Sequence, residues 1–313
     1  MTRSPTFAAR MFYRFRGETP GVTIFSYHGV APEPLPVDYP SFMPLTVFRR
    51  QVERIGRRYD VLPLEEALER LWRGRLRFPA AVLTFDDGYR NNHEIAFPLL
   101  RRLGLPAALF VCTAPVAARR TFWFARLHRA LCLTARREVD WQGARHDLSS
   151  RTSRATASSR WRAALKQLPP VEIDAACDAL CGLLEVPEGG PADPVFGVMD
   201  EAALRELDAG GLVVLGGHTR HHWILSRLQM AEQAAEIAGC ADDLERWTGR
   251  RPRCFAYPNG KAEDFPADCG AILGALGFKA ALTTIHGDCV REHPWWCLPR
   301  IGMDAKHGER RIR

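Results

Sequence analysis

Short apolar runs alternate along the chain with longer segments whose apolar residues recur at helical spacing. The runs are VTIFSY (22–27), YDVL (59–62), AAVLTF (80–85), PAALFV (106–111), LVVLGG (212–217), CFAY (254–257) and KAALTT (279–284). Near-continuous hydrophobicity of this kind is typical of parallel strands that are covered on both faces. Helical spacing occurs at 64–72, 94–103, 229–247 and 266–276. The alternation predicts an α/β fold with a parallel sheet, either open or closed into a barrel.

This rhythm breaks between about residues 115 and 200. The stretch contains two or three helical patterns, the polar segment SSRTSRATASSR (149–160) and a hairpin signal around VDWQGARHDL (139–148), but no run typical of a barrel strand. We therefore expect a single domain over residues 1–313, with an insertion at about 115–200 that packs beside the barrel mouth and is not an independent domain.

Composition narrows the class of protein. With 46% hydrophobic and 25% charged residues the chain is an ordinary globular one, and no stretch is apolar enough to span a bilayer. The start, MTRSPTFAARMFYRFRGETP, lacks the continuous apolar core of a secretory signal, so we expect a cytoplasmic location. The nine cysteines are irregularly spaced, and even Cys177 and Cys181, one helical turn apart, lack a second pair to complete a metal site. We interpret all nine as structural thiols.

The net charge of +7 is concentrated in the insertion, where residues 115–170 contain twelve Lys or Arg against three acidic residues. This pattern is typical either of a solvated helical face or of an electropositive surface that attracts anionic partners. The second interpretation predicts an anionic or lipid-linked substrate and peripheral contact with a membrane. No nucleic-acid-binding motif is present, so we expect no nucleic-acid partner. The interleaved aromatic residues Phe122, Trp123, Phe124 and Trp161 have helical periodicity and fit either a wall of the site or the core.

Polar side chains follow four of the apolar runs. His28 comes directly after the first run, Asp86 and Asp87 after the third, His218 after the fifth, and 258–260 (Pro-Asn-Gly) after the sixth. In barrels and in open α/β sheets alike, ligands bind at the carboxyl ends of the strands. We therefore expect these groups to converge on one mouth.

Two of these segments have the composition of a metal site. Asp86 and Asp87 are adjacent carboxylates at the end of a buried run, which is unfavourable without a cation, although Asp-Asp-Gly is also good turn chemistry. His218 and His222 are four residues apart, with His221 as a competitor for the second position. Asp87 and two histidines would supply three ligands and leave positions open for water and substrate.

These segments together carry a family resemblance. TFDDG (84–88), H-T-x-x-H (218–222) and FAYPNG (255–260) resemble the polysaccharide deacetylase family, carbohydrate esterase family 4, with its NodB-like homology domain. FSYHGV (25–30) and LPRIGM (298–303) resemble the branch of this family that contains biofilm poly-glucosamine deacetylases. The resemblance covers about residues 21–111 and 200–303 and leaves the insertion outside.

The resemblance implies a distorted (β/α)7–8 barrel, with the basic helical insertion near its mouth. It also implies one divalent metal ion, expected to be Zn²⁺, held by Asp87, His218 and His222. Asp86 would be the general base that takes a proton from the attacking water. The backbone N–H of Asn259 would stabilise the oxyanion of the tetrahedral intermediate.

Two positions depart from the family pattern. Ala256 stands where the family usually has an arginine that steadies the catalytic aspartate, and Arg300 is the expected replacement. The usual late Leu-x-His, which supplies the general acid, is missing. His28 is the expected acid in its place, with His293 and His307 as the remaining candidates.

The activity implied by the resemblance is hydrolytic removal of an N-acyl group, expected to be acetyl, from an amino sugar. The sugar can belong to a glycan, a lipid-linked sugar or a sugar nucleotide. Two alternatives stay open: a carbohydrate-binding relative that has lost turnover, and an O-acetyl esterase or deformylase of the same family.

Overall fold

The computed structural model describes residues 21–190, 192–306 and 308–312. The N-terminal segment considered above for a secretory signal, and His307, lie outside these ranges.

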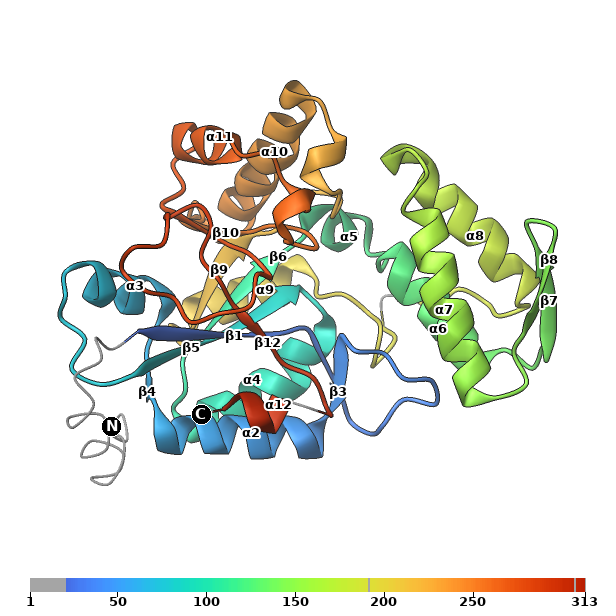
Figure 1. Cartoon of the computed structure of the whole chain (residues 1–313), viewed down its shortest axis with the longest axis horizontal. Coiled ribbons are helices and arrows are strands. Elements are labelled where there is room, and N and C mark those ends of the chain that lie inside the picture. The colour runs from blue at the N-terminus through green and yellow to red at the C-terminus, as the bar shows by residue number, and fades with distance from the viewer. Residues whose placement is uncertain (1–20, 191, 307, 313) are drawn as a thin grey trace.

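A parallel sheet forms the centre of the molecule (Figure 1). Its strands follow the order β11-β10-β9-β6-β5-β1-β12, and the short strand β4 pairs with β5. The bounds are β1 (Val22–Tyr27), β4 (Asp60–Val61), β5 (Ala80–Asp87), β6 (Ala107–Val111), β9 (Val213–Gly217), β10 (Cys254–Ala256), β11 (Ala280–Leu282) and β12 (Ile301–Gly302). All seven strands expected from the apolar runs are present, and β12 is an additional one.

The segment 298–303 connects the two edges of this sheet. On one side, the Leu298 N–H donates to the Ala281 carbonyl oxygen (3.0 Å), and the Thr283 N–H donates to the Leu298 carbonyl oxygen (2.9 Å). On the other side, β12 pairs with β1, and the Met303 N–H donates to the Ser26 carbonyl oxygen (2.9 Å). The sheet therefore curls round on itself, and the expected distorted (β/α) barrel is confirmed.

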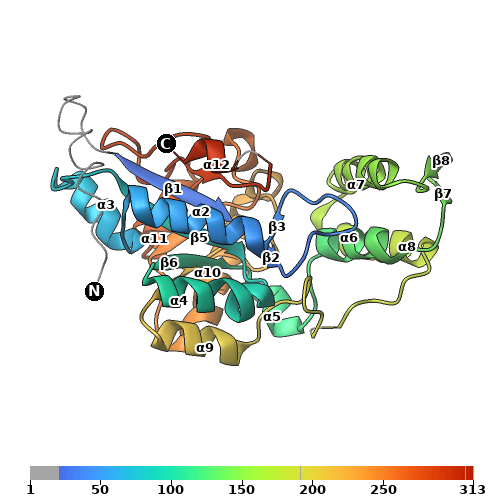
Figure 2. The same cartoon turned by 90° about the horizontal axis from the view of Figure 1, so that it is seen from below.

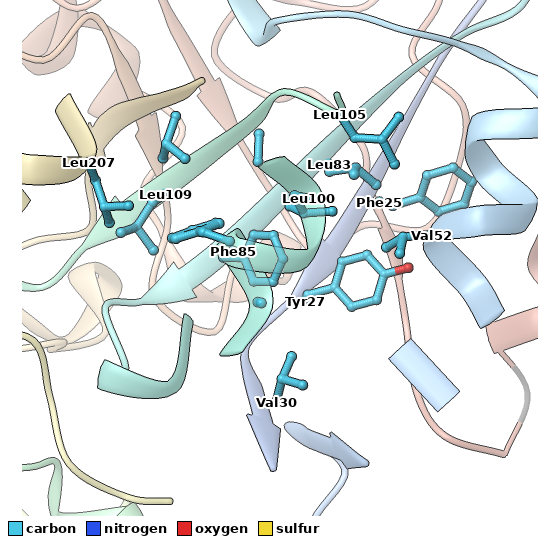
Figure 3. Packing of buried hydrophobic residues seen from close by; sticks show 14 of the residues in the cluster. Phe25, Tyr27, Val30, Val52, Leu83, Phe85, Leu100, Leu105, Leu109 and Leu207 are labelled. Atoms are coloured by element: carbon cyan, nitrogen blue, oxygen red, sulfur yellow. The ribbon is translucent and has the colours of Figure 1, made fainter. Parts of the chain in front are cut away.

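Helices pack around the barrel (Figures 1 and 2). They are α2 (Leu45–Arg58), α3 (Leu64–Trp72), α4 (Phe97–Leu103) after a π-helical turn (Asn92–Ala96), α9 (Glu201–Ala209), α10 (Met230–Thr248) and α11 (Cys269–Ala275). The four helices expected from helical spacing are among them, while α2 and α9 were not expected. Figure 3 shows the main core, in which Phe25 and Leu83 of the strands pack against Val52 of α2 and Leu100 of α4.

A second apolar cluster fills the barrel interior. It contains Ile24, Val82 and Phe110 from three different strands, together with Leu68 of α3. Because side chains alternate along a strand, Asp86 lies on the same face of β5 as Val82. This buried carboxylate therefore continues the inward-facing row of β5 at its carboxyl end.

The insertion is a helical unit with a core of its own. The short helix α5 (Thr113–Ala118) precedes it and packs on the barrel, where Val116 belongs to the main core. The unit itself comprises α6 (Trp123–Leu133), α7 (Arg151–Leu165), α8 (Ile173–Leu183) and the antiparallel hairpin β7 (Glu138–Trp141) and β8 (Ala144–Asp147). The expected hairpin is therefore confirmed. Trp161 is fully buried at the centre of this core. Figures 1 and 2 show the unit standing beside the barrel, beyond the carboxyl end of β1.

An aromatic cluster joins this unit to the barrel. Tyr39 and Phe42 come from the loop and strand around β3 (Phe42–Pro44), Tyr89 follows β5, and Phe122 begins α6. β2 (Gly29–Ala31) pairs with β3 beside this junction. The insertion is therefore held against the mouth by packed side chains as well as by its two chain connections.

Two further observations concern the chain as a whole. All nine cysteines are free thiols, and six of them are buried. Within the described ranges, no helix is both long enough and apolar enough to cross a membrane.

Candidate functional site

The residues expected at the strand ends come together in one cleft at the barrel mouth. This cleft is lined by His28, Asp86, Asp87, His218, His222 and Asn259. Arg300 lies fully buried beneath it. The groups reach the cleft from four different strands because parallel strands end at the same edge of the barrel.

Asp87, His218 and His222 lie within ligand distance of a common point. Asp87 Oδ1 is 3.5 Å from His218 Nε2 and 3.4 Å from His222 Nε2, and the ligand atoms of the three residues all lie within 4.8 Å of one another. Asp87 Oδ1 is also buried without a hydrogen-bond partner among the residues of the structure. A buried carboxylate oxygen facing two imidazole nitrogens is a donor set that suits a divalent cation such as Zn²⁺.

The orientation of the donors supports this fit. His218 Nδ1 lies 2.7 Å from the Ala256 carbonyl oxygen, so Nδ1 carries the proton and Nε2 presents its lone pair to the site. Burial raises the pKa of Asp87, but the nearby imidazoles of His218 and His222 outweigh this effect, so its pKa lies below the usual range. Asp87 is therefore an ionised carboxylate at neutral pH.

His221 lies elsewhere, although it is adjacent to His222 in sequence. Its backbone N–H donates to Glu236 Oε2 (2.9 Å), and its imidazole pairs with the same carboxylate, on α10. The side chain is about 40% exposed. Of the two candidates for the second histidine, the structure therefore places His222 beside Asp87.

Backbone strain is concentrated at this site. Asp87, Thr219, His222 and Asn259 all have positive φ, at 79°, 64°, 61° and 58°. This region is unfavourable for most side chains and exceptional for a β-branched residue such as Thr219. The Thr219 hydroxyl accepts a hydrogen bond from the His222 N–H (3.0 Å), which holds the turn that brings the two histidines together. Strain of this kind is typical of functional sites.

Asp86 is held by Arg300. The guanidinium donates to both carboxylate oxygens at 2.8 Å, and its Nε donates to the Thr283 carbonyl oxygen at 2.7 Å. Burial raises the pKa of Asp86, but the charges of Arg300 and His218 outweigh it and lower the pKa. The segment that closes the barrel thus supplies the arginine that keeps Asp86 ionised and fixed in orientation.

His28 and Asn259 lie on either side of this pair. His28 Nε2 is 3.9 Å from Asp86 Oδ2, and the imidazole is about 30% exposed to the cleft. The Asn259 side-chain oxygen accepts a hydrogen bond from Lys166 Nζ (3.1 Å). Of the two other histidines considered as the acid, His293 binds the backbone of Val290 and does not line the cleft, while His307 lies outside the described residues.

The insertion supplies much of the cleft wall. Trp123, Phe124, Arg162 and Lys166 line it, and the Phe124 ring lies 5.1 Å from the ring of His222. Phe122 and Trp161, by contrast, are buried core residues. The sequence contains no signal for which residues of the insertion line the cleft, beyond their aromatic and basic composition. The spacing of residues along a helix does not tell which of its turns faces the barrel.

Most arginines of the insertion have acidic partners, which favours the solvated helical face among the two interpretations of its basic charge. Arg120 and Arg126 pair with Asp178, Arg129 pairs with Asp193, and Arg136 pairs with Glu185. These carboxylates come from 172–193, beyond the segment in which basic residues outnumber acidic ones. The charge excess of residues 115–170 is therefore largely neutralised within the insertion itself.

A family model described as "Polysaccharide deacetylase" matches residues 73–281, more than half of the chain. No curated protein matches the sequence.

Several solved structures share the fold. The Streptococcus pyogenes deacetylase PplD, in complex with acetate, is 15% identical over 94% of this chain and 97% of its own, with a TM-score of 0.61. IcaB from Ammonifex degensii is 19% identical over 94% and 96%, with a TM-score of 0.61. The deacetylase domain of BpsB from Bordetella bronchiseptica is 16% identical over 91% and 96%, with a TM-score of 0.54. At these identities the likeness establishes the fold alone.

Proposed function

The chain belongs to the polysaccharide deacetylase family, and from this premise we propose that it is a metal-dependent hydrolase that removes an N-acyl group, acetyl above all, from an amino sugar. The observation that carries the proposal is the convergence of Asp87, His218 and His222 beside a separately held carboxylate, Asp86. The sugar can be part of a glycan, a lipid-linked sugar or a sugar nucleotide.

The metal would be held by Asp87 Oδ1 and the two imidazole Nε2 atoms. The unpartnered Oδ1 supports this assignment, because a buried carboxylate oxygen without a donor is unfavourable unless a cation faces it. When bound, a divalent cation polarises the substrate carbonyl and makes water more acidic. Carboxylate and imidazole ligands favour Zn²⁺.

Asp86 would accept the proton of the attacking water. Both of its oxygens are engaged by Arg300, yet each carboxylate oxygen retains a second acceptor site that can face the cleft. Its lowered pKa keeps it ionised and ready to act as a base at neutral pH. Arg300 acts through Asp86 and is therefore a positioning residue.

His28 would donate a proton to the departing amine. It lines the cleft beside Asp86 and is partly exposed, so it can exchange protons with solvent between turnovers. The backbone N–H of Asn259 would stabilise the oxyanion, in a loop that the hydrogen bond from the Thr284 hydroxyl to the Asn259 carbonyl oxygen (2.6 Å) holds in place.

The proposal is tested by release of acyl groups from defined substrates. The metal-loaded chain is incubated separately with three substrates, and the carboxylic acid released from each is quantified. The substrates are N-acetylglucosamine oligomers, glucosamine oligomers that carry acetyl groups on hydroxyls and have free amines, and an N-formyl amino sugar. Release of acetate from the N-acetylated oligomers, abolished in Asp86→Asn, supports N-deacetylation. Release only from the O-acetylated or N-formyl substrates would assign an esterase or a deformylase, and binding of oligomers without any release would indicate a non-catalytic relative.

A further inference from the structure

Three cationic side chains line the same cleft as the candidate metal site. Arg162 lies on the last turn of α7, and Lys166 follows directly after that helix. Arg227 comes from the barrel, in the short 3₁₀ turn Leu225–Arg227 that follows the histidine segment. The insertion and the barrel therefore both direct positive charge into the cleft.

These three side chains make hydrogen bonds only to neutral acceptors. Arg162 donates to the Ser158 carbonyl oxygen (3.3 Å) and stacks over the Tyr39 ring (5.2 Å), Lys166 donates to Asn259, and Arg227 donates to Gln167 (3.5 Å). Within the described part of the chain, no carboxylate forms an ion pair with any of them. Arg120, Arg126 and Arg129 of the insertion differ, since all three are ion-paired.

The acidic residues of the cleft do not compensate this charge. Only Asp86 and Asp87 among the cleft-lining residues are acidic, and they are engaged by Arg300 and by the two histidines. The pKa of Lys166 is lowered, first by burial and then by the positive charges of Arg162, Lys261 and Arg227, against an opposing effect of Asp264. The cations therefore repel one another, and an anion bound between them would remove this repulsion.

An adjoining groove continues outward from the cleft. It is lined by Lys166, Arg227 and Asn259, which it shares with the cleft, and by Lys261 and the acidic residues Glu263 and Asp264. Lys261 pairs with Glu263 at 3.7 Å, so the cations without a carboxylate partner among the described residues of this groove are Lys166 and Arg227. A ligand whose acyl group lies at the metal site would thus carry its remaining parts past Lys166 and Arg227. A neutral glycan would leave them solvated and would gain nothing from them.

We propose that Arg162, Lys166 and Arg227 form a binding subsite for a phosphate or diphosphate group on the amino sugar that the chain deacylates. Two guanidinium groups and one ammonium suit the multiple charge of a phosphate, to which arginine binds in a bidentate manner. The inference rests on the proposed function for the position of the acyl group. Nucleotide sugars and polyprenyl-linked sugars share this chemistry.

The test measures binding by titration calorimetry with the metal-loaded Asp86→Asn chain, which prevents turnover. The ligands are N-acetylglucosamine, its 1-phosphate, its uridine diphosphate conjugate, and its polyprenyl diphosphate conjugate in detergent micelles. We expect the phosphorylated sugars to bind at least about ten-fold more tightly than the neutral sugar. The diphosphate conjugate that binds more tightly identifies the carrier.

In the double variant Arg162→Gln/Arg227→Gln, the ratio of the Kd for the neutral sugar to the Kd for the phosphorylated sugar should fall close to one. Arg160→Gln is the matched control, because Arg160 is an exposed residue of α7 that does not line the cleft, and its loss should keep the preference. If the double variant fails to fold, Arg227→Gln alone, at an exposed position, should still lower the preference. Equal binding of neutral and phosphorylated sugars, or an equal loss in Arg160→Gln, would overturn the proposal.

Turnover assays on the unmodified metal-loaded chain separate this inference from the proposed function. If phosphorylated sugars bind more tightly but no sugar is deacylated, the proposed phosphate subsite is supported and the proposed hydrolase activity is refuted. If neutral oligomers are deacylated but phosphorylated sugars bind no more tightly, the subsite is refuted and the hydrolase activity is supported.

Discussion

The adjacent residues Asp86 and Asp87 contact different partners. Asp86 continues the inward-facing row of β5 and meets Arg300, while the positive φ of Asp87 accompanies its placement beside His218 and His222. At the scale of single residues, the site therefore depends on one sharp change in backbone direction at the end of a strand. Gly88 follows at φ 91°, a value that glycine adopts without strain.

The first prediction separates the two histidines that the sequence offers. His222→Ala should reduce the metal content of the purified chain strongly, because it removes one of three protein ligands. His221→Ala is the matched control, since this side chain pairs with Glu236, and it should retain the metal. Metal content is measured by elemental analysis after dialysis. If His221→Ala loses the metal and His222→Ala keeps it, then His221 and not His222 is the metal ligand.

The second prediction concerns the carboxylate beside the metal ligands. Asp86→Asn should keep the metal but lower kcat by about 10² to 10⁴, the usual contribution of a general base. Metal content and steady-state rates on an N-acetylated oligomer are compared in the same preparations. Near-normal turnover in Asp86→Asn would mean that another group accepts the proton.

The residue scale also shows what the sequence could predict of the site. The pairs Asp86 and Asp87, and His218 and His222, stand out because carboxylates and imidazoles at strand ends have few structural uses. The choice between His221 and His222 could not be made from spacing, because the deciding contact is with Glu236, fifteen residues away on α10. The acids that neutralise the insertion were missed for the same reason.

At the scale of elements, apolar runs predicted seven strands of the central sheet and missed β12. The seven runs all correspond to strands, and nearly all residues of these strands are buried. β12 is only two residues long and has no run of its own, so its place between β1 and β11 follows from tertiary structure alone. Helix α2 could have been predicted, since Phe48, Val52 and Ile55 have helical spacing.

The third prediction concerns Arg300, which directly precedes β12. Arg300→Met leaves the buried Asp86 without a guanidinium partner and should lower the free energy of unfolding by about 3 to 5 kcal/mol. Chemical denaturation measures this change. Arg136→Gln, which removes an exposed ion pair with Glu185, serves as the control and should have little effect. Equal stability of Arg300→Met and the unmodified chain would show that the pair contributes no net stability.

At the scale of the whole molecule, the junction between insertion and barrel contains a buried histidine. His128 of α6 stacks on Tyr39 with a centroid distance of 4.2 Å, and its Nε2 lies 3.2 Å from the Val37 carbonyl oxygen. Burial lowers its pKa to about 4, although the hydrogen bond to Val37 acts in the opposite direction. The folded chain therefore holds this imidazole neutral at a contact between its two parts.

The fourth prediction follows from that pKa. The unfolded chain binds a proton at this imidazole near pH 6.5, while the folded chain does so only near pH 4. Stability should therefore fall as the pH drops through this window, by about 3 kcal/mol from this group. His128→Phe should reduce the loss of unfolding free energy between pH 7 and pH 4 by about this amount, whereas the exposed His286→Phe should not. Parallel pH profiles of His128→Phe and the unmodified chain would contradict the assignment.

The closing segment has a consequence for synthesis on the ribosome. Arg300 and Asp86 are 214 positions apart, so the strand that joins the barrel edges emerges long after the strands it must meet. Contacts of such large sequence separation form late and slowly. The nascent chain thus contains the three expected metal ligands, Asp87, His218 and His222, before Arg300 can pair with the proposed general base. Until residues 298–303 dock, the edges of β1 and β11 stay open to pairing with other chains, which makes this interval the one in which a chaperone would matter most.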